Sequence, residues 1–333
     1  MLFVPVVNQN QEPLMPTIPS RARRWIKSGK ATPFWKKGVF CVRLNIQTQE
    51  NKQDVVVGID PGSKKEGFTV KSTSHTYLNI QADAVTWVKD AVERRRNARR
   101  ARRNRKTPCR KARWNRKGRS IAPSTKARWQ WKLRILNWLK KMFPIAFVIV
   151  EDIKARTTGQ KRWDLSFSPL QVGKKWFYEQ VGDPILVQGY ETKQIRDLWG
   201  LKKSSNKLSN SFGAHCVDSW VLANGAVGGH EKPDNTDILF LTPLQFHRRQ
   251  LHVFQFAKGG IRKKYGGTRS LGFKRGSLVK HPKYGLTYVG GVPNADRISL
   301  HSLEDGKRIY QNAKPQDCRF LSYNSWRCRK EVT

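Results

Sequence analysis

Acidic residues are scarce in this chain. Its 333 residues include 24 Asp and Glu against 65 Lys and Arg, for a formal net charge of +41. This excess is too large for ordinary solubility tuning. It favours a polyanionic partner, above all nucleic acid, with an anionic membrane surface as the weaker alternative. The 12 Trp and 11% aromatic residues argue against a disordered basic tail, because such side chains bury area and promote packing.

Long apolar runs and paired cysteines are also missing. The longest uncharged apolar run, MFPIAFVIV at 142–150, is far shorter than the roughly 20 residues needed to span a bilayer, so we expect no transmembrane span. Of the two polyanionic partners, we predict nucleic acid and not a membrane. The amino terminus, MLFVPVVNQNQ, lacks the charged region and cleavage site of a secretion signal. The five Cys form no CxxC pair and are odd in number, which fits a reducing cytosol and gives no zinc signature. We therefore expect a cytoplasmic protein.

The pattern of apolar runs and turns predicts a mixed α/β chain. A small α+β unit is expected first, with a basic helix, SRARRWIKSG, that Ser20 can cap and Gly29 can end. The two apolar runs of DVVVGIDPGSKKEGFTV predict a hairpin whose first strand is buried on both faces. Near the carboxyl end, short strands and turns predict a separate β-barrel-like unit. The predicted boundaries are 1–50 for the amino-terminal unit, 51–93 for the first part of the core, 94–120 for an arginine-rich segment, 121–228 for the rest of the core and 229–333 for the carboxy-terminal unit.

The arginine-rich segment carries 15 Lys or Arg among the 26 residues from Arg94 to Arg119. Its first half favours a helix without an apolar stripe, in which like charges at i,i+4 repel. We expect such a helix to be firm only when phosphates surround it; the alternative is a solvated linker. The predicted nucleic-acid contacts here are Arg94, Arg95, Arg96, Arg99, Arg100, Arg102, Arg103, Arg105, Arg110, Arg113, Trp114 and Arg116.

The rest of the core is predicted from helical and strand periodicity. The segment WQWKLRILNWLK at 129–140 places four apolar residues on one helical face, so it should pack on a sheet. The strand IAFVIV follows, then a helix around 191–200 and a further helix, SNSFGAHCVDSWVLANGA, that closes near Gly225. The four residues on the predicted face are Trp131, Ile135, Leu136 and Leu139.

Three acidic residues border apolar elements: Asp60 after VVVGI, Glu151 after FVIV, and Asp218 in AHCVD. An unpaired carboxylate in an apolar run is costly unless it is paired or bound to a metal ion. If clustered, these carboxylates would repel one another, and divalent cations are the usual remedy. Such sets bind Mg²⁺ in two-metal phosphodiester hydrolysis. We therefore predict a Mg²⁺ centre in which Mn²⁺ could substitute; two ions are expected, and a single ion is the alternative that the sequence leaves open.

Each of these residues has a plainer interpretation. Asp60 precedes Pro-Gly and could be a turn residue, and Glu151 could end a surface strand. Asp152 competes with Glu151, because neighbouring strand residues point to opposite faces. His215 lies three residues before Asp218, so on a helix both would share a side and the imidazole could orient or deprotonate a water. It could equally be a core histidine with satisfied hydrogen bonds.

The segments GIDPGSKKEG, VIVEDI and HCVDSWVLA, in this order, resemble the three split motifs of a RuvC-type nuclease, which has an RNase H-like fold. An arginine-rich bridge helix between the first and second motifs resembles the transposon-encoded ancestors of type II CRISPR effector nucleases. EPLMP at 12–16, followed by RARRWIKSGKA, resembles the PLMP domain of the IscB and IsrB families. Together these resemblances cover nearly all of residues 1–228.

The chain differs from the IscB family in one respect, which points to a particular related family. IscB and its CRISPR relatives carry an HNH nuclease between the second and third RuvC motifs. Here only 63 residues separate Glu151 from His215, and none of them is His. An HNH site needs His as its general base, so the chain resembles IsrB, the family without HNH.

The resemblance implies a function. Asp60, Glu151 and Asp218 would bind the metal ions, and His215 would activate or orient the water. An omega RNA would pair with one strand of double-stranded DNA while the single nuclease centre nicks the other strand. One protein copy per ribonucleoprotein is expected, in a prokaryotic cytoplasm and on the nucleoid when bound to DNA. Such effectors hold the guide duplex by its backbone in a positive channel.

The carboxy-terminal unit matches in position the domain that reads the motif flanking the target in this family. Arg and Lys are the usual readers of base edges in the major groove. A barrel that binds the RNA scaffold is an equally open interpretation. The predicted contacts in this unit are Lys263, Lys264, Arg269, Lys274 and Arg275.

Other functional classes remain as alternatives. A catalytically silent RNA-guided or RNA-scaffold-binding protein would keep the basic surface without cutting DNA. A stand-alone junction-resolving or transposition nuclease could use the same acids, although neither a PLMP segment nor a bridge helix is expected in it. A third alternative, a larger effector from which the HNH nuclease was deleted, is disfavoured because every other segment keeps its order.

Overall fold

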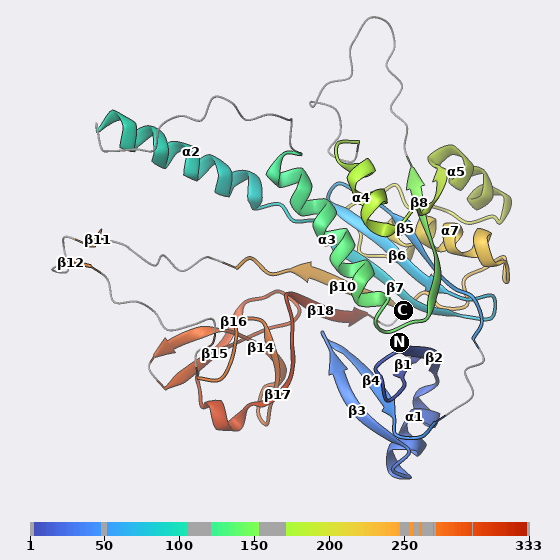
Figure 1. Cartoon of the computed structure of the whole chain (residues 1–333), viewed down its shortest axis with the longest axis horizontal. Coiled ribbons are helices and arrows are strands. Elements are labelled where there is room, and N and C mark those ends of the chain that lie inside the picture. Colours follow the sequence, from blue (N-terminus) through green and yellow to red (C-terminus); the bar gives the residue numbers. More distant parts are fainter. Residues whose placement is uncertain are drawn as a thin grey trace, which may run out of the picture.

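A computed structural model of the chain shows a mixed α/β protein in which a large sheet carries most of the helices (Figure 1). A small amino-terminal unit and a carboxy-terminal barrel lie next to each other beside this sheet. In the part of the chain that the structure describes, no helix is both long and apolar enough to cross a membrane. The described residues are 3–47, 52–105, 121–152, 171–246, 254–255, 260–261, 269, 271–294 and 296–331.

The amino-terminal unit is a four-stranded sheet in the order β2-β1-β4-β3, with helix α1 packed on it. Helix α1 begins at Pro19, so the predicted cap Ser20 is wrong: it lies inside the first turn, and the N-cap position is Ile18. A proline fits the first helical position because its missing N–H would be unpaired there anyway. Gly29 follows the end of the helix with φ +71°, as predicted. The elements are β1 (Val4–Val7), β2 (Pro13–Thr17), α1 (Pro19–Lys27), β3 (Ala31–Lys36) and β4 (Val39–Leu44).

The central sheet has seven strands in the order β18-β10-β7-β6-β5-β8-β9. β5 and β6 form the predicted antiparallel hairpin, whereas β5, β8 and β9 run parallel to one another. β10 lies parallel to β7 and antiparallel to β18. The strands are β5 (Val55–Asp60), β6 (Lys65–Lys71), β7 (Thr76–Asp83), β8 (Ile145–Asp152), β9 (Ile185–Gln188), β10 (Ile238–Pro243) and β18 (Trp326–Glu331).

Two of these strands come from the 229–333 region that the sequence analysis assigns to a separate unit. The run ILFLTP of β10 is buried at five of its six positions, which is the pattern of a strand covered on both faces. β18 then forms the edge of the same sheet. The carboxy-terminal barrel is therefore an insertion between two strands of the central sheet, and the boundary at 229 does not match the sheet topology.

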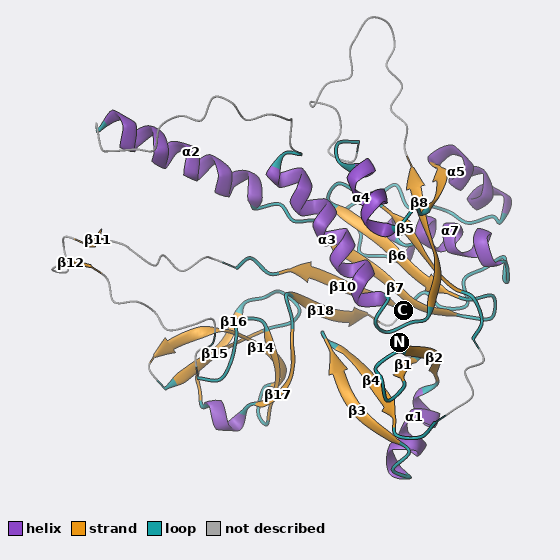
Figure 2. Ribbon diagram, in the orientation of Figure 1, coloured by secondary structure: helices purple, strands orange, loops and turns teal. Residues whose placement is uncertain are grey.

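Helices cover both faces of the central sheet (Figure 2). α3 and α4 pack on the face formed by alternate residues such as Val55, Val57 and Ile59. α7 packs on the opposite face, and α5 lies beside it. The predicted buried face of α3 is confirmed, since all four of its residues are 1% exposed or less. The helices are α3 (Pro123–Leu139), α4 (Lys174–Val181), α5 (Gly189–Leu198), α6 (Phe212–His215) and α7 (Val217–Val227).

Helix α2 (Val88–Asn104) contains the first half of the arginine-rich segment. It begins six residues before the predicted boundary at 94, where Trp87 and Val88 pack against the main core. From Glu93 onward its described side chains are exposed, and the helix extends away from the sheet in Figure 1. The predicted contacts Arg94, Arg95, Arg96, Arg99, Arg100, Arg103 and Arg105 thus stand in solvent, while the side chain of Arg102 and residues Arg110, Arg113, Trp114 and Arg116 lie outside the described residues.

The carboxy-terminal barrel is built on a five-stranded antiparallel sheet in the order β16-β15-β14-β13-β17. Its core contains Val279, Val289, Ile298 and Leu300. A two-stranded pair, β11 with β12, precedes it. The elements are β11 (Phe254–Gln255), β12 (Gly260–Ile261), β13 (Ser277–His281), β14 (Gly285–Asn294), β15 (Arg297–His301), β16 (Arg308–Ala313), the 3-10 helix η2 (Pro315–Asp317) and β17 (Arg319–Tyr323).

Candidate metal centre

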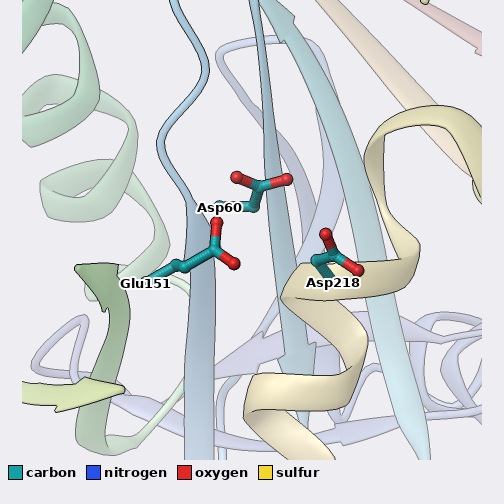
Figure 3. A group of neighbouring side chains, drawn as sticks. All are labelled: Asp60, Glu151 and Asp218. Carbon is teal, nitrogen blue, oxygen red and sulfur yellow. The ribbon is translucent and has the colours of Figure 1, made fainter. Parts of the chain in front are cut away.

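Three carboxylates from distant parts of the chain meet at one end of the central sheet. Asp60 is the last residue of β5, Glu151 lies next to the end of β8, and Asp218 is in the first turn of α7. One ligand oxygen from each lies within 4.8 Å of the others. Figure 3 shows the three side chains converging on one point. The structure thus brings together the three acids that the sequence analysis selects.

Strand alternation explains why Glu151, rather than Asp152, joins this cluster. Ile149 packs with the residues under α7, and Glu151, two residues further along β8, points to the same face. Asp152 points to the opposite face, where it accepts hydrogen bonds from Lys174 at 2.6 Å and from the Tyr178 hydroxyl at 3.0 Å. Burial acts to raise the pKa of Asp152, but these two bonds, together with the charge of Lys174 and a contribution from Gln188, lower it overall.

Two glycines allow α7 to approach the sheet closely enough to bring Asp218 to Asp60. A Cβ atom on Gly58 of β5 would lie 2.0 Å from the carbonyl oxygen of Ser219, and one on Gly67 of β6 would lie 2.0 Å from that of His215. Gly67 is also the cross-strand partner of Asp60. Any side chain at these positions would push the helix away from the strand that carries Asp60.

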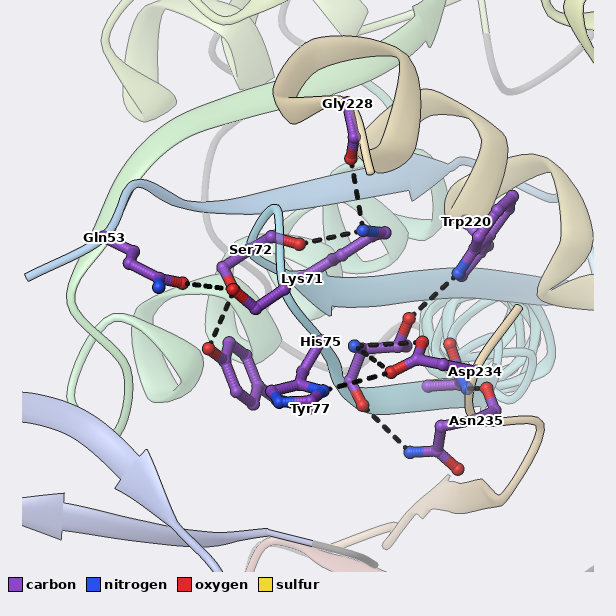
Figure 4. Close-up of polar contacts among 12 residues, drawn as sticks. Gln53, Lys71, Ser72, His75, Tyr77, Trp220, Gly228, Asp234 and Asn235 are labelled. Atoms are coloured by element: carbon purple, nitrogen blue, oxygen red, sulfur yellow. Dashed lines mark hydrogen bonds and ion pairs between the residues drawn. The ribbon is translucent and has the colours of Figure 1, made fainter. Parts of the chain in front are cut away.

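A polar network holds the far end of α7 (Figure 4). The buried Lys71 donates hydrogen bonds to the carbonyl oxygens of Ser72 at 2.8 Å and of Gly228, just beyond α7, at 3.3 Å. The indole N–H of Trp220 donates to the Thr76 hydroxyl at 3.0 Å. A cation at the carboxyl end of a helix is favourably placed with respect to the helix dipole. The helix is therefore fixed at both ends.

Burial and crowding of like charges dominate the electrostatics of the cluster. Glu151 is 7% exposed, and its burial, followed by the charges of Asp60 and Asp218, raises its pKa to about 8. A carboxyl with such a pKa is largely protonated at neutral pH unless a cation compensates its charge. A nearby cation would therefore stabilise the charged form of Glu151.

Two cationic side chains that the sequence analysis did not select supply such positive charge. Lys203, from the loop between α5 and α6, lies with its ammonium nitrogen 3.4 Å from Asp60 Oδ2 and in contact with Asp218 Oδ2. Arg196 of α5 donates a hydrogen bond to the other Asp218 oxygen at 2.7 Å. Burial lowers the pKa of Lys203, but the charges of Asp60 and Asp218 outweigh it and the pKa lies above its ordinary value. No local sequence signal distinguishes Lys203 from the neighbouring lysines.

His215 is close to the cluster but is not one of its ligands in this arrangement. It ends α6, and Cys216 separates it from α7, so the single helix predicted over this segment is broken there. Its Nε2 lies 3.2 Å from the carbonyl oxygen of Lys207. Burial and the charge of Lys65 lower the pKa of His215, which favours the neutral imidazole. A role in water activation stays a prediction.

The donor set fits a hard divalent cation. All three ligands are carboxylates, the type of ligand that Mg²⁺ and Mn²⁺ prefer. The ammonium of Lys203 lies between two of them, so a positive group is already accommodated in this geometry. Asp60, Glu151 and Asp218 could therefore hold a metal ion.

Of the contacts predicted in the carboxy-terminal unit, Arg269, Lys274 and Arg275 are among the described residues, and none of these three belongs to the carboxylate cluster. Arg269 and Arg275 are exposed, and the ammonium of Lys274 lies 5.0 Å from the centre of the Tyr323 ring. Lys263 and Lys264 lie outside the described residues. The described part of the carboxy-terminal unit thus presents exposed cations, and base reading and scaffold binding both stay predictions.

The fold and the site define a mixed α/β protein with an acidic centre, able to hold a metal ion, at the carboxyl ends of adjacent parallel strands. Residues 4–163 match the model of a family described as RRXRR protein. That match includes Asp60, Glu151 and the whole arginine-rich segment, where Arg99 to Arg103 read RRARR, and it ends before Asp218. No curated protein matches the chain.

Proposed function

We propose that this protein is an RNA-guided DNA endonuclease that nicks one strand of double-stranded DNA at the carboxylate cluster. The observation that carries the proposal is the convergence of Asp60, Glu151 and Asp218 within 4.8 Å. The family that matches residues 4–163 is associated with IscB- and IsrB-like proteins, which supports the RNA-guided class. The resemblance of the split motifs to an RNase H-like RuvC nuclease of the IsrB type points in the same direction.

The chain's own residues have defined parts in this proposal. Asp60, Glu151 and Asp218 would hold Mg²⁺ or Mn²⁺, which when bound supplies an activated water and stabilises the leaving oxygen of the phosphodiester. Arg196 fixes the orientation of the Asp218 carboxylate. His215, with a pKa below its ordinary value, is poised to accept a proton from water rather than to donate one.

A polyanionic partner would explain why helix α2 carries so many exposed arginines. A helix whose arginines are exposed has no apolar face to bury and is destabilised by its own charges. Phosphates arranged around it would remove that repulsion, and an RNA backbone supplies them. The proposal therefore places α2 against the RNA or the guide duplex, with the target DNA beyond it.

A strand-resolved cleavage assay tests the proposal. The protein is co-expressed with the noncoding RNA that flanks its gene and is incubated in Mg²⁺ with supercoiled plasmid carrying the complementary target. We expect an RNA-dependent nick in the strand that does not pair with the guide, lost in Asp60→Asn and in Asp218→Asn. Asp152→Asn is the matched control, because this acid borders Glu151 but faces away, and it should keep the nick.

Two outcomes would contradict the proposal. A nick of unchanged rate in Asp60→Asn would remove the cluster from the chemistry. RNA-dependent DNA binding with no nick in the wild type would leave a guided DNA-binding protein, in which Lys203 and Arg196 serve to neutralise a non-catalytic cluster.

A further inference from the structure

We propose that a groove between the amino-terminal unit and the carboxy-terminal barrel binds an unstacked nucleotide in a single-stranded part of the RNA partner. The groove has a volume of about 330 Å³. Its walls include Trp35 and Phe40 of the first unit, and Lys280, Leu286, Arg319 and Leu321 of the barrel. This inference deepens the proposed function and rests on its RNA partner.

The first wall of the groove is aromatic. Trp35 and Phe40 face each other across the hairpin of β3 and β4, with ring centroids 5.8 Å apart and ring planes at 73°. Both rings are only half-buried, so part of their surface stays available. Proteins that hold single-stranded nucleic acid stack its bases on such rings, since every base has a π face.

The second wall carries two cations that oppose each other. Lys280 of β13 and Arg319 of β17 are cross-strand partners, and both side chains are exposed. Like charges directly opposite each other destabilise a sheet. In the described part of the chain, no acidic side chain forms an ion pair with either of them or lines the groove. A phosphate placed between the two would relieve the repulsion and accept charge-assisted hydrogen bonds from both.

A neighbouring cavity lacks this charge pattern. It is larger, about 680 Å³, and it shares Trp35 and Phe40 with the groove. The two cations in its lining are paired with the two acids there, Lys330 with Asp237 at 3.3 Å and Arg329 with Glu304 at 3.9 Å, so neither is left over for a phosphate. The combination of aromatic rings with unopposed cations therefore selects the smaller groove as the one suited to a nucleotide.

The position of the groove favours RNA over the DNA strand that is cut. The strand β8 runs away from the amino-terminal unit and the barrel toward the end that carries Glu151 (Figure 1). The DNA strand that is cut must lie at that end of β8, and the groove lies near the opposite end. A nucleotide bound in the groove would belong to another nucleic-acid segment, which we assign to the RNA.

Cross-linking of the whole ribonucleoprotein tests the assignment directly. Ultraviolet irradiation of the full chain with its co-expressed noncoding RNA, followed by mass spectrometry, should give a ribonucleotide adduct on the peptide that contains Trp35 and Phe40. A deoxyribonucleotide adduct there in the presence of target DNA, with no ribonucleotide adduct, would overturn the choice of RNA.

Variants separate binding from folding. Binding of the same RNA is measured in a chelator, so that no cleavage chemistry is involved. Loss of two phosphate contacts in the double variant Lys280→Ala and Arg319→Ala should reduce the slope of log affinity against log salt by about 1.4. Trp35→Leu should weaken binding roughly tenfold, the order expected for one base stack. A second double variant, Lys283→Ala with Lys314→Ala, removes two exposed barrel cations outside the groove and is the charge-matched control.

The thermal midpoint without RNA distinguishes a ligand site from a structural role. Removing the opposed pair Lys280 and Arg319 should leave this midpoint unchanged or raise it, while RNA affinity falls. A fall in both would overturn the inference, as would an affinity loss no larger than that of the control variant. If the wild type does not bind the RNA at all, the proposed function itself fails. If the wild type binds and the groove variants match it, only the groove assignment fails.

Discussion

The ammonium nitrogen of Lys203 lies 3.4 Å from Oδ2 of Asp60, one of the three clustered acids. It also contacts Asp218, so one cation bridges two carboxylates. The side chain is 35% exposed, which lets it leave the cluster without crossing the core. The ammonium of Lys203 thus neutralises part of the charge of the clustered acids. A divalent ion would compete with it for the oxygens of Asp60 and Asp218.

Replacement of Lys203 by Met should therefore have opposite effects on the metal-free and metal-loaded protein. Without metal, three crowded carboxylates lose a counter-charge, and the free energy of unfolding should fall by about 1–2 kcal/mol, less than for a fully buried pair. With the competitor gone, Mn²⁺ should bind more tightly, which isothermal titration calorimetry measures. Lys202→Met, one residue away and exposed, is the control. Weaker Mn²⁺ binding in Lys203→Met would show that the ammonium supports the metal site instead.

The raised pKa of Glu151 gives the metal-free protein a pH-dependent stability. The pKa is about 8 in the folded chain against an ordinary value of 4.5, so between these pH values the folded state holds a proton that the unfolded state has lost. Stability is then fully present below pH 4.5 and is lost as the pH rises through 8, by roughly 3–5 kcal/mol.

Glu151→Gln should remove this loss. In a chelator, chemical denaturation should give similar stability for the variant and the wild type at acid pH and a more stable variant at alkaline pH. The control is Glu179→Gln, an exposed glutamate on α4, which should follow the wild type. Parallel stability curves for wild type and Glu151→Gln would contradict the pKa shift.

The close approach of α7 to β6 makes Gly67 a positioning residue for the cluster. A Cβ at Gly67 would lie 2.0 Å from the carbonyl oxygen of His215, the last residue of α6, and 3.1 Å from the hydroxyl of Ser219 in α7. Because only Cys216 separates the two helices, the backbone at His215 cannot move aside without moving the start of α7. We expect Gly67→Ala to lower the free energy of unfolding by about 1–3 kcal/mol and to reduce the thermal shift caused by Mn²⁺, because Asp218 moves with the helix. Gly291→Ala is the matched change, since no atom lies within 4 Å of its Cβ position. A normal Mn²⁺ shift in Gly67→Ala would separate the helix position from metal binding.

The three acids could be found from the sequence because each one follows or lies within an apolar run. Asp60, Glu151 and Asp218 follow or lie within buried stretches, and a carboxylate is too costly there to be incidental. The choice between Glu151 and Asp152 could not be made in this way, because both acids directly follow the same apolar run. It is decided by the partners that Lys174 and Tyr178 supply to Asp152 from a helix packed on the other face.

The misplaced boundary at 229 has a related cause. β10 pairs with β7 on one side and with β18 on the other, both across large sequence separations, and such pairing leaves no periodic signal within either strand. Lys203 was missed for the same kind of reason. It sits in a loop rich in Lys and Ser, where nothing local marks one lysine as the partner of two distant acids.

A buried ion pair joins the sheet to helix α3 on the face opposite the cluster. Lys132 donates a hydrogen bond to Glu66 at 2.9 Å, and the two side chains are 1% and 0% exposed. Burial raises the pKa of Glu66, and Lys132 offsets only part of that rise. Lys132→Met leaves the carboxyl buried without its partner and should lower the free energy of unfolding by about 3–5 kcal/mol.

The double variant Glu66→Leu with Lys132→Met tests whether the pair itself stabilises the fold. A pair of apolar side chains of similar volume avoids the desolvation of both charges, so we expect the double variant to be more stable than either single variant. Urea denaturation of the four proteins in a chelator measures the coupling free energy. If the double variant loses as much as the two single variants together, the ion pair contributes no coupling and the cost of Lys132→Met arises from lost packing against Trp129, whose ring centre lies 4.6 Å from the ammonium.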